Sequence, residues 1–354
     1  MIVIAADPHK STHTAAAVDP LTGELRGSET VSATAAGHGR LLDWGRSLDS
    51  QRVWAVEDCR HVSGSLERFL VAGGEPVVRV APKLMAGARR SLRQRGKSDQ
   101  IDALAVARAA IREGLDSLPA AQLDERALEV KLLLDHREDL VGQRSDDQRR
   151  LRWHLHDLWP ELSIPAGALD RECWLQKLAR RLSRAPRSAR VRVSRELVRS
   201  IRQRTRRERE LEREIVALVS QQAPSLLEIP GCGALSAAKL LAEAAGFDRF
   251  ASDAQFARLA GVAPIPASSG RTDRHRLDRG GNRQLNCALH RIAVTQGRVD
   301  ADARAFLAKK AAEGKGRMEA LRCLKRHLAR RVWKAMRAPQ KATAGRAPDT
   351  LVLT

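Results

Sequence analysis

Residues 2–33 read IVIAADPHKSTHTAAAVDPLTGELRGSETVSA. The apolar run Ile2–Ala6 predicts a buried strand, and Thr12–Asp19 predicts a second short strand. Pro20–Glu24 contains proline and glycine in the spacing of a turn, and Glu29–Ala33 predicts a third strand. The stretch therefore predicts a three-stranded meander at the start of the chain.

Helices and strands alternate after this meander. Helices are predicted at Ala36–Leu48 and Ser63–Ala72, and strands at Arg52–Glu57 and Pro76–Ala81. A longer helix is predicted over Gln100–Glu113, with apolar residues at helical spacing. Three meandering strands followed by alternating helices and strands are typical of a ribonuclease H-like α/β domain, although other α/β folds begin in a similar way.

Four carboxylates fall at points that this fold would bring together. Asp7 follows the first strand and Glu57 ends the fourth, and these strands are neighbours in a ribonuclease H-like sheet. Asp99 and Asp102 lie three residues apart, so they share one face at the start of the long helix. Clustered carboxylates repel one another unless cations compensate, and hard oxygen ligands favour Mg²⁺ or Mn²⁺. The pattern predicts a divalent-metal site.

Each acid also has an ordinary structural explanation. Asp7 could cap the turn after its strand, and Asp58 could take the place of Glu57. Asp99 could be a helix N-cap, and Asp102 could favour the positive end of the helix dipole. The joint spacing of the acids over three elements favours the metal site.

The composition points to a polyanionic partner. The 354 residues include 63 Lys and Arg against 42 Asp and Glu, which gives a net charge of +21 and a pI near 11.0. Nucleic acid is the usual partner of such a surface. We find no long apolar run or amphipathic anchor that predicts a membrane protein, and the first residues do not resemble a signal peptide.

Two residue types restrict the chemistry further. The five cysteines are widely spaced without a C-x-x-C pair, which argues against a zinc ribbon and fits a cytoplasmic protein with reduced thiols. Tyrosine is absent, so a tyrosine nucleophile for DNA strand transfer is excluded.

The middle of the chain predicts two long charged helices. The first covers 123–161, and between Arg180 and Arg213 the chain holds fourteen arginines and four acidic residues. A narrow apolar seam predicts a coiled coil, either antiparallel within the chain or between subunits. The seam consists of Leu197, Ile201, Leu211, Ile215 and Leu218. The segment between the helices carries Pro165, Gly167 and Pro186 and suits a turn.

The arginines on the second long helix have two explanations, a solvated helix face and a nucleic-acid contact. Their density favours nucleic acid. The residues predicted to bind it are Arg202, Arg206 and Arg209, which lie near one helix face.

The last third begins with LLEIPGCGALSAAKLLAEA, residues 226–244. This pattern predicts a helix-hairpin-helix, in which Gly231 and Gly233 allow a tight turn whose free N–H groups can bind a phosphate. An ordinary turn between helices without a ligand is the alternative. The loop PIPASSG at 264–270 places Ser268 and Ser269 before a glycine, where a hydroxyl nucleophile would have room to meet a bulky substrate.

Two further helices are predicted at Asn282–Thr295 and Asp302–Arg337, followed by a disordered tail. The predicted domains are a ribonuclease H-like domain at 1–117, a coiled-coil and arginine-rich region at 118–222, a C-terminal domain at 223–337 and the tail at 338–354.

Four motifs, in this order, resemble the DEDD transposases of the Piv/MooV type, which are encoded by insertion sequences. They are AADPHKSTHTAAAVD (5–19), VEDCRHVSGSLERFL (56–70), GKSDQIDALAVARAA (96–110) and LAGVAPIPASSGRTDRHRLDRGGNRQL (259–285). The resemblance spans almost the whole chain. It implies a RuvC-like N-terminal domain with the four acids Asp7, Glu57, Asp99 and Asp102.

The same resemblance implies a serine nucleophile at Ser269, which would form a covalent phosphoserine intermediate with DNA and leave a free hydroxyl on the other strand end. It also implies a structured guide RNA, and Arg271 beside the serines is predicted to contact nucleic acid. Recombination of two duplexes needs four strand cleavages, so a dimer or tetramer on DNA is expected. A metal-dependent RuvC-like endonuclease that uses water, and a non-enzymatic nucleic-acid-binding protein, are the alternatives.

Overall fold

The computed structural model describes residues 1–58, 60–82, 84–85, 98–121, 124–247, 250–268, 275–276, 278 and 280–337. The chain divides into two compact units, which are described separately. The first unit comprises Met1–Glu125, Ala244–Cys287 and Phe306–Thr354, and the second comprises Arg126–Glu243 and Ala288–Ala305.

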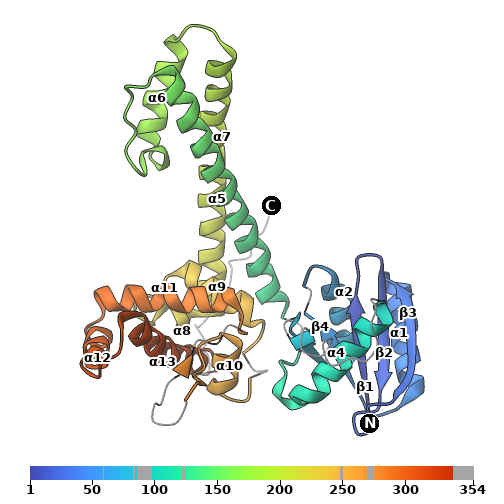
Figure 1. Cartoon of the computed structure of the whole chain (residues 1–354). Helices are drawn as coiled ribbons and strands as arrows, with labels where there is room; N and C mark the ends of the chain where they lie inside the picture. The colour runs from blue at the N-terminus through green and yellow to red at the C-terminus, as the bar shows by residue number, and fades with distance from the viewer. Residues whose placement is uncertain are drawn as a thin grey trace, which may run out of the picture. The chain divides into compact units, whose positions relative to one another are not determined.

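The first unit contains a five-stranded sheet with the order β3-β2-β1-β4-β5 (Figure 1). Its strands are β1 (Ile2–Pro8), β2 (Thr12–Val18), β3 (Leu25–Ser32), β4 (Arg52–Glu57) and β5 (Val77–Val80). The first three strands are antiparallel neighbours, whereas β4 pairs parallel with both β1 and β5. This is the strand order of a ribonuclease H-like sheet, so the predicted fold class is confirmed.

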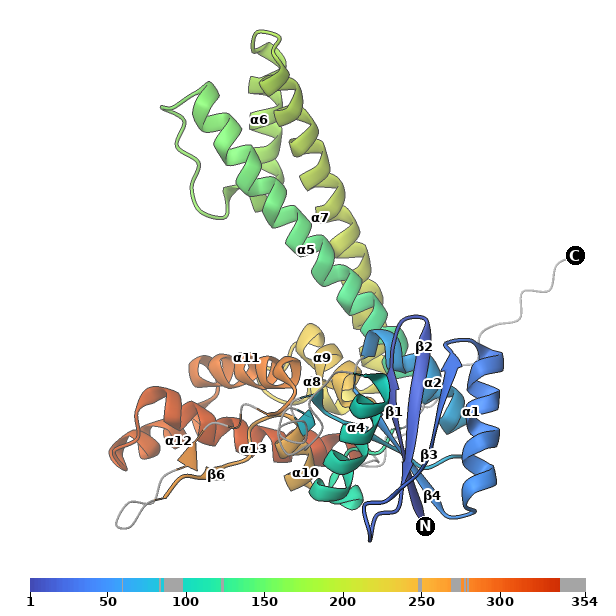
Figure 2. The same ribbon diagram turned by 45° about the vertical axis from the view of Figure 1, so that its right-hand side comes forward.

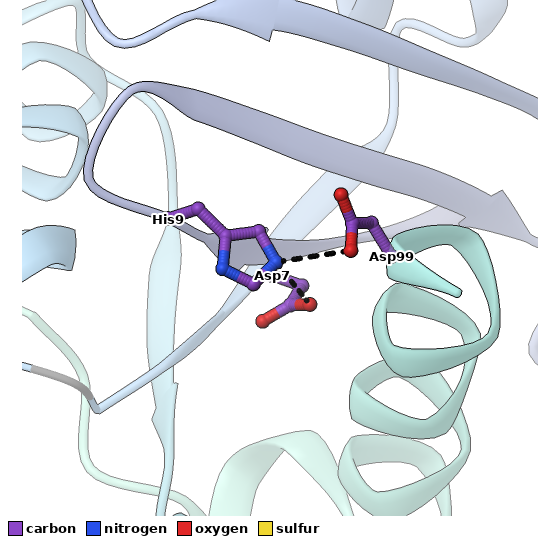
Figure 3. Close-up of side chains that lie close together, drawn as sticks. All are labelled: Asp7, His9 and Asp99. Carbon is purple, nitrogen blue, oxygen red and sulfur yellow. Dashed lines mark ion pairs between the residues drawn. The ribbon is translucent and has the colours of Figure 1, made fainter. Parts of the chain in front are cut away.

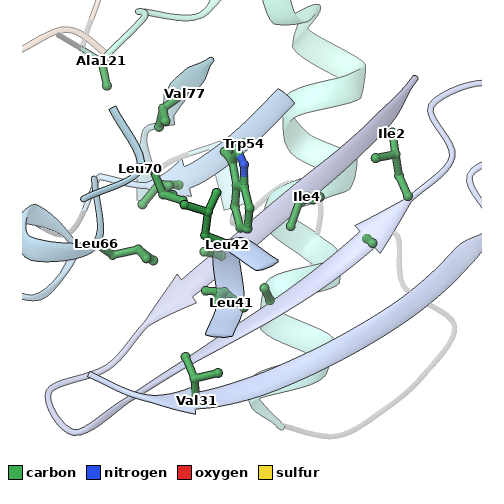
Figure 4. Close-up of a cluster of buried hydrophobic side chains, with 14 residues drawn as sticks. Ile2, Ile4, Val31, Leu41, Leu42, Trp54, Leu66, Leu70, Val77 and Ala121 are labelled. Atoms are coloured by element: carbon green, nitrogen blue, oxygen red, sulfur yellow. The ribbon is translucent and has the colours of Figure 1, made fainter. Parts of the chain in front are cut away.

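Both faces of β1 are covered, which explains why its sequence is an unbroken apolar run. Ile2 and Ile4 pack with Trp54 and with residues of α1 (Ala35–Leu48) and α2 (Arg60–Ala72), as Figure 4 shows. Side chains alternate along a strand, so Val3 and Ala5 face the opposite way. They pack with the alanine-rich face of α4 (Asp99–Glu113). The sheet therefore lies between two helical layers, with α4 on the face opposite α1 and α2.

The boundaries differ most at β3, which begins at Leu25 where the sequence predicted Glu29. The preceding turn lies at Pro20–Glu24 as predicted, and Asp19 closes it. Its carboxylate accepts hydrogen bonds from the backbone N–H groups of Leu21 and Thr22. The chain therefore becomes extended at Leu25, four residues before the predicted start, and these four residues make up half of the eight-residue edge strand β3.

The second unit contains a long helical hairpin built from α5 (Glu125–Leu158) and α7 (Ala189–Gln222), which run antiparallel side by side in Figures 1 and 2. Their connection contains the short 3-10 turn η2 (Ala168–Asp170) and a 13-residue helix, α6 (Glu172–Arg184). Only a turn was predicted here, so α6 was missed. Its buried leucines, Leu175, Leu178 and Leu182, have the spacing of one helix face.

The apolar seam of α7 is occupied within the chain. Leu197 and Ile201 are buried in one cluster with Leu151 and Leu155 of α5 and the leucines of α6. Leu211 and Ile215 are also buried, and Leu218 is half-buried. The antiparallel alternative predicted from the sequence is therefore found in this chain, and these buried residues offer no free seam to a second subunit.

The predicted hairpin between helices is formed by α8 (Pro224–Leu227) and α9 (Ala234–Ala244). Gly231 has a φ of 77°, which side chains rarely adopt. A Cβ at Gly231 would also meet the carbonyl oxygen of Ile292 at 3.2 Å. Glycine is thus required both by the turn and by the close approach of residues from α11 (Arg283–Val299).

The remaining elements are η1 (Leu115–Ser117), α10 (Asp253–Leu259), the two-residue strands β6 (Ile265–Pro266) and β7 (His275–Arg276), α12 (Ala301–Ala312) and α13 (Arg317–Arg337). The last two were predicted as one helix. The chain breaks at Gly314, whose φ of 80° ends α12. The predicted tail at 338–354 lies outside the described residues. In the part that the structure describes, no helix is both long and apolar enough to cross a membrane.

Candidate active site

Asp7 and Glu57 lie side by side at one end of the sheet. The parallel register pairs Ala6 of β1 with Val56 of β4, so the next residue on each strand is one of these acids. Both are buried, and their side chains share a hydrogen bond. Parallel strands end at the same edge, which is why two residues fifty positions apart meet.

The other two acids come from the first turn of α4. Its N-cap is Ser98, whose hydroxyl accepts a hydrogen bond from the N–H of Ile101, so the N-cap role considered for Asp99 is wrong. Asp102 is buried, whereas the side chain of Asp99 is 55% exposed. The helix packs against β1, and both acids act electrostatically on Asp7. The structure therefore brings all four predicted acids together.

A histidine that was not predicted from the sequence completes this cluster. The Nε2 atom of His9 lies 3.3 Å from Oδ2 of Asp7 and 3.3 Å from Oδ1 of Asp99 (Figure 3). One ligand atom from each of the three residues falls within 4.8 Å of the others. The available signal was the spacing: His9 follows Asp7 by two residues, just beyond the end of β1.

The pKa of Asp7 is raised by its burial and by neighbouring acids, and His9 offsets this effect only in part. Burial raises the pKa of Asp7 because it disfavours the charged carboxylate, and the nearby Asp102 and Asp99 raise it further. His9 and the hydrogen bond with Glu57 act in the opposite direction. Burial therefore disfavours the charged form of Asp7, and a bound cation would stabilise that form.

The donor set fits a divalent metal ion. In the described part of the chain, Oδ2 of Asp7 and Nε2 of His9 are buried without a hydrogen-bond partner, although each lies at ion-pair distance from the other. Carboxylate oxygens are the ligands that Mg²⁺ and Mn²⁺ prefer, and a neutral imidazole suits Mn²⁺ better than Mg²⁺. Asp7, Glu57, Asp99 and Asp102 would hold the ion, with His9 beside them.

Replacing Asp7 by asparagine is expected to stabilise the metal-free protein, because it removes a carboxylate whose charged form is disfavoured chiefly by burial. Thermal unfolding in EDTA should show a higher midpoint for Asp7→Asn than for the wild type. Mg²⁺ or Mn²⁺ should raise the midpoint of the wild type more than that of the variant. Asp43→Asn, which changes an exposed acid of α1, is the control and should leave both midpoints unchanged.

The predicted nucleophile Ser269 and the predicted contact Arg271 lie outside the described residues. Ser268 is described and is exposed. It follows β6 by two residues, in the segment that connects β6 to β7.

The predicted nucleic-acid arginines line one groove on the helical hairpin. This groove, of about 1520 Å³, lies between α6 and α7 and includes Arg202, Arg206 and Arg209. Arg206 and Arg209 are exposed, whereas Arg202 is half-buried and forms an ion pair with Glu172 at 2.7 Å. Arg180 and Arg213 also line the groove and are exposed, so of its five arginines only Arg202 is half-buried.

Other arginines of the hairpin stabilise it. Arg137 and Arg144 of α5 both pair with Glu208 of α7, at 2.9 and 3.1 Å. Arg204 of α7 pairs with Asp147 of α5. The high arginine density thus has two origins, ion pairs between the long helices and an exposed set in the groove.

Two protein-family models, both of transposases, match the sequence of this chain. A DEDD transposase model of the IS110 type, described as "Transposase", matches residues 4–160. The model described as "Transposase IS116/IS110/IS902 family" matches residues 223–308. A DEDD transposase domain implies divalent metal ions, in agreement with the acid cluster.

Proteins of three insertion elements are similar to this chain. The 44.8 kDa protein of IS116 from Streptomyces clavuligerus is 26% identical over 95% of this chain and 94% of its own length. The 42 kDa protein of IS900 from Mycobacterium paratuberculosis is 26% identical, over 80% and 82% respectively. The 43.6 kDa protein of IS110 from Streptomyces coelicolor is 37% identical over 32% of this chain and 29% of its own.

Among solved structures, T. thermophilus RuvC in complex with a Holliday junction substrate covers 32% of this chain and 96% of its own, with 19% identity and a TM-score of 0.26. The two family models match the N-terminal and C-terminal parts of the sequence, and the similarity to the IS116 protein extends over nearly its whole length. The chain thus carries a DEDD transposase domain at residues 4–160 and a domain of the IS116/IS110/IS902 transposase family at residues 223–308, the parts of an enzyme that cleaves and transfers DNA.

Proposed function

We propose that this transposase cleaves and rejoins DNA through a covalent phosphoserine intermediate, using Ser269 as nucleophile and the acid cluster as its metal site. The observation that carries the proposal is the convergence of Asp7, Glu57, Asp99 and Asp102 on one end of the sheet. Formation of a denaturant-stable DNA–protein adduct that requires a divalent metal tests it.

The four acids would hold Mg²⁺ or Mn²⁺, which supplies charge stabilisation for the oxygens around phosphorus when bound. The protein's part is to fix the ligands. β1 and β4 hold Asp7 and Glu57 rigidly, and the Ser98 cap fixes the turn of α4 that carries Asp99 and Asp102. His9 bridges Asp7 and Asp99 and would orient both carboxylates.

In the proposed reaction the Oγ atom of Ser269 forms a bond to phosphorus as the bond from phosphorus to one strand oxygen breaks. The serine loses its proton, and the leaving strand ends as a hydroxyl that has gained one. One phosphodiester is exchanged for another, so a strand hydroxyl can later attack the phosphoserine and restore DNA without an external energy source.

Nucleic acid would also contact the basic surface outside the active site. The net charge of +21 and the exposed arginines of the groove support a polyanion on the helical hairpin. A guide RNA and the DNA substrate are both proposed partners, the RNA by family resemblance. Assembly into a dimer or tetramer is proposed because two duplexes require four strand cleavages.

Removing the groove arginines together should reduce the salt dependence of nucleic-acid binding. In Arg202→Gln/Arg206→Gln/Arg209→Gln, the slope of log affinity against log salt should become less negative by about 0.9 for each duplex phosphate that is no longer neutralised. Fluorescence anisotropy over a salt series measures this slope.

The matched control takes three exposed arginines from the same helix outside the groove, Arg192, Arg195 and Arg199. Its net charge equals that of the groove variant, so a general charge effect would flatten both slopes alike. An unchanged slope in the groove variant would show that these arginines are only a solvated helix face.

A further inference from the structure

A second basic site lies at the base of the segment that carries the serines. A cavity of about 270 Å³ is lined by Pro264, by His275 and Arg276 of β7, and by Arg322, Lys325 and Arg326 of α13. Pro264 immediately precedes β6 and His275 begins β7, so the cavity is lined by residues that come before and after the connection holding Ser268 and Ser269 in the sequence. All of these lining residues are described and belong to the first unit.

Several cations around this cavity already have acidic partners. Lys310 pairs with Glu313 at 2.7 Å, and Lys315 lies 3.8 Å from Glu319. Arg326 donates to Asp253 at 3.0 Å. These pairs contribute little net charge to the cavity.

Three other cations are not neutralised in this way. Among the described residues, Arg276, Arg322 and Lys325 form no ion pair with a carboxylate, although all three line the cavity. The lining acid Asp278 caps its own turn by accepting a hydrogen bond from the N–H of Gly280 at 2.7 Å. The cavity therefore has an excess of positive charge.

Lys325 is the most constrained of the three. Its side chain is buried, and its Nζ donates to Oδ1 of Asn286 at 2.8 Å. Asn286 is itself fixed, because its amide donates to the carbonyl oxygens of Ala260 and Gly261. Burial lowers the pKa of Lys325, and the charge of Arg322 lowers it further. An ammonium has three donors, so this one can still bind an anion in the cavity.

We propose that this cavity binds a DNA phosphate close to the one attacked by the serine, with Lys325 and Arg322 as its direct ligands. The proposal rests on the proposed function, because the serine connection gives the cavity its role. A phosphate fits the chemistry: it would compensate two adjacent cations and accept charge-assisted hydrogen bonds from both. Asn286 is a positioning residue that holds the Lys325 ammonium in place.

The test measures occupancy of the cavity without cleavage. Cys323 lines the cavity and is partly exposed, so a small neutral alkylating reagent reports whether its surroundings are covered. The full chain carrying Asp102→Asn is alkylated with and without a duplex of the element end, an RNA duplex of the same sequence, or inorganic phosphate. Peptide mass spectrometry follows Cys323, and its alkylation rate is compared with that of an added cysteine-containing peptide. Cys173 of α6 is not used as the reference because it adjoins Glu172, which lines the arginine groove.

We expect the DNA duplex to slow alkylation of Cys323 relative to the added peptide. Lys325→Met keeps the apolar stem and removes the charge, and it should raise the DNA concentration needed for protection about tenfold. Arg322→Gln should have a similar effect, and Lys325→Arg should retain most of the protection. Arg331→Gln removes an exposed charge from the same helix outside the cavity. In this variant the DNA duplex should protect Cys323 from alkylation as well as it does in the parent protein.

Unchanged protection in both Lys325→Met and Arg322→Gln would overturn the proposal, as would an equal loss in Arg331→Gln. Protection by the RNA duplex alone would overturn the assignment to DNA. Because the alkylation measurement needs no cleavage, it separates the phosphate-site proposal from the phosphoserine proposal. If the wild type forms the covalent adduct while Cys323 stays unprotected, only the phosphate-site proposal is contradicted.

Discussion

Asp102→Asn is expected to abolish strand cleavage while nucleic-acid binding stays largely intact. The substitution removes one ionised ligand from a cluster in which Asp7, Glu57 and Asp99 also converge, and it changes no basic residue. Loss of a metal ligand should lower the cleavage rate by roughly 10³-fold or more, since the charge around phosphorus is no longer compensated. Cleavage of labelled element-end DNA in Mg²⁺ or Mn²⁺ measures the rate, and anisotropy measures binding.

Asp99→Asn should behave in the same way, and titration calorimetry should show weaker metal binding in both variants. Asp116→Asn, which alters a carboxylate of η1 outside the cluster, is the control and should cleave like the wild type. Wild-type cleavage by either Asp102→Asn or Asp99→Asn would remove that acid from the proposed site. Any metal-dependent cleavage by the wild type would exclude the alternative of a purely nucleic-acid-binding protein.

Ser269→Ala should eliminate the covalent DNA–protein adduct, because it removes the oxygen that would bond to phosphorus. The expected loss of strand transfer is about 10⁴-fold or more, as for removal of a catalytic nucleophile. Denaturing gels of reactions with end-labelled DNA measure the adduct, and mass spectrometry identifies the modified serine.

Ser268→Ala is the matched control, since it deletes the same hydroxyl one position earlier in the connection between β6 and β7. It should retain the adduct. If Ser269→Ala still cleaves DNA at the wild-type rate without an adduct, the enzyme uses water and the endonuclease alternative holds. If the adduct disappears only in Ser268→Ala, the neighbouring serine is the nucleophile.

The strand pattern of the first unit was predictable because its signals are local. Ile2–Pro8 is apolar at every position before Asp7, so the sequence predicts a strand covered on both faces. The capping turn at Asp19 and the break at Gly314 have equally local causes, yet their exact positions depend on hydrogen bonds and backbone angles. For that reason β3 began earlier than predicted and the last helix divided into α12 and α13.

The helical hairpin has features that local sequence patterns do not predict. The leucine spacing of α7 predicts an apolar seam but does not specify what covers it, because helices of one chain or of two bury the same face equally well. In the structure the seam is covered within the chain, because α6 supplies Leu175, Leu178 and Leu182 to the same buried cluster. The division of arginines into ion pairs and exposed groove residues is likewise a tertiary property.

The sequence by itself determined the fold class and the family resemblance and predicted the four acids of the proposed site, since each depends on residue types at fixed spacings. The tertiary structure alone decided that His9 joins Asp7 and Asp99, and that Arg322 and Lys325 of α13 line one cavity with Pro264 and His275. These contacts join residues from separate elements, and their energies depend on burial and on distances of a few ångströms. Spacing along the chain specifies neither quantity, so such sites emerge only when strands and helices are packed.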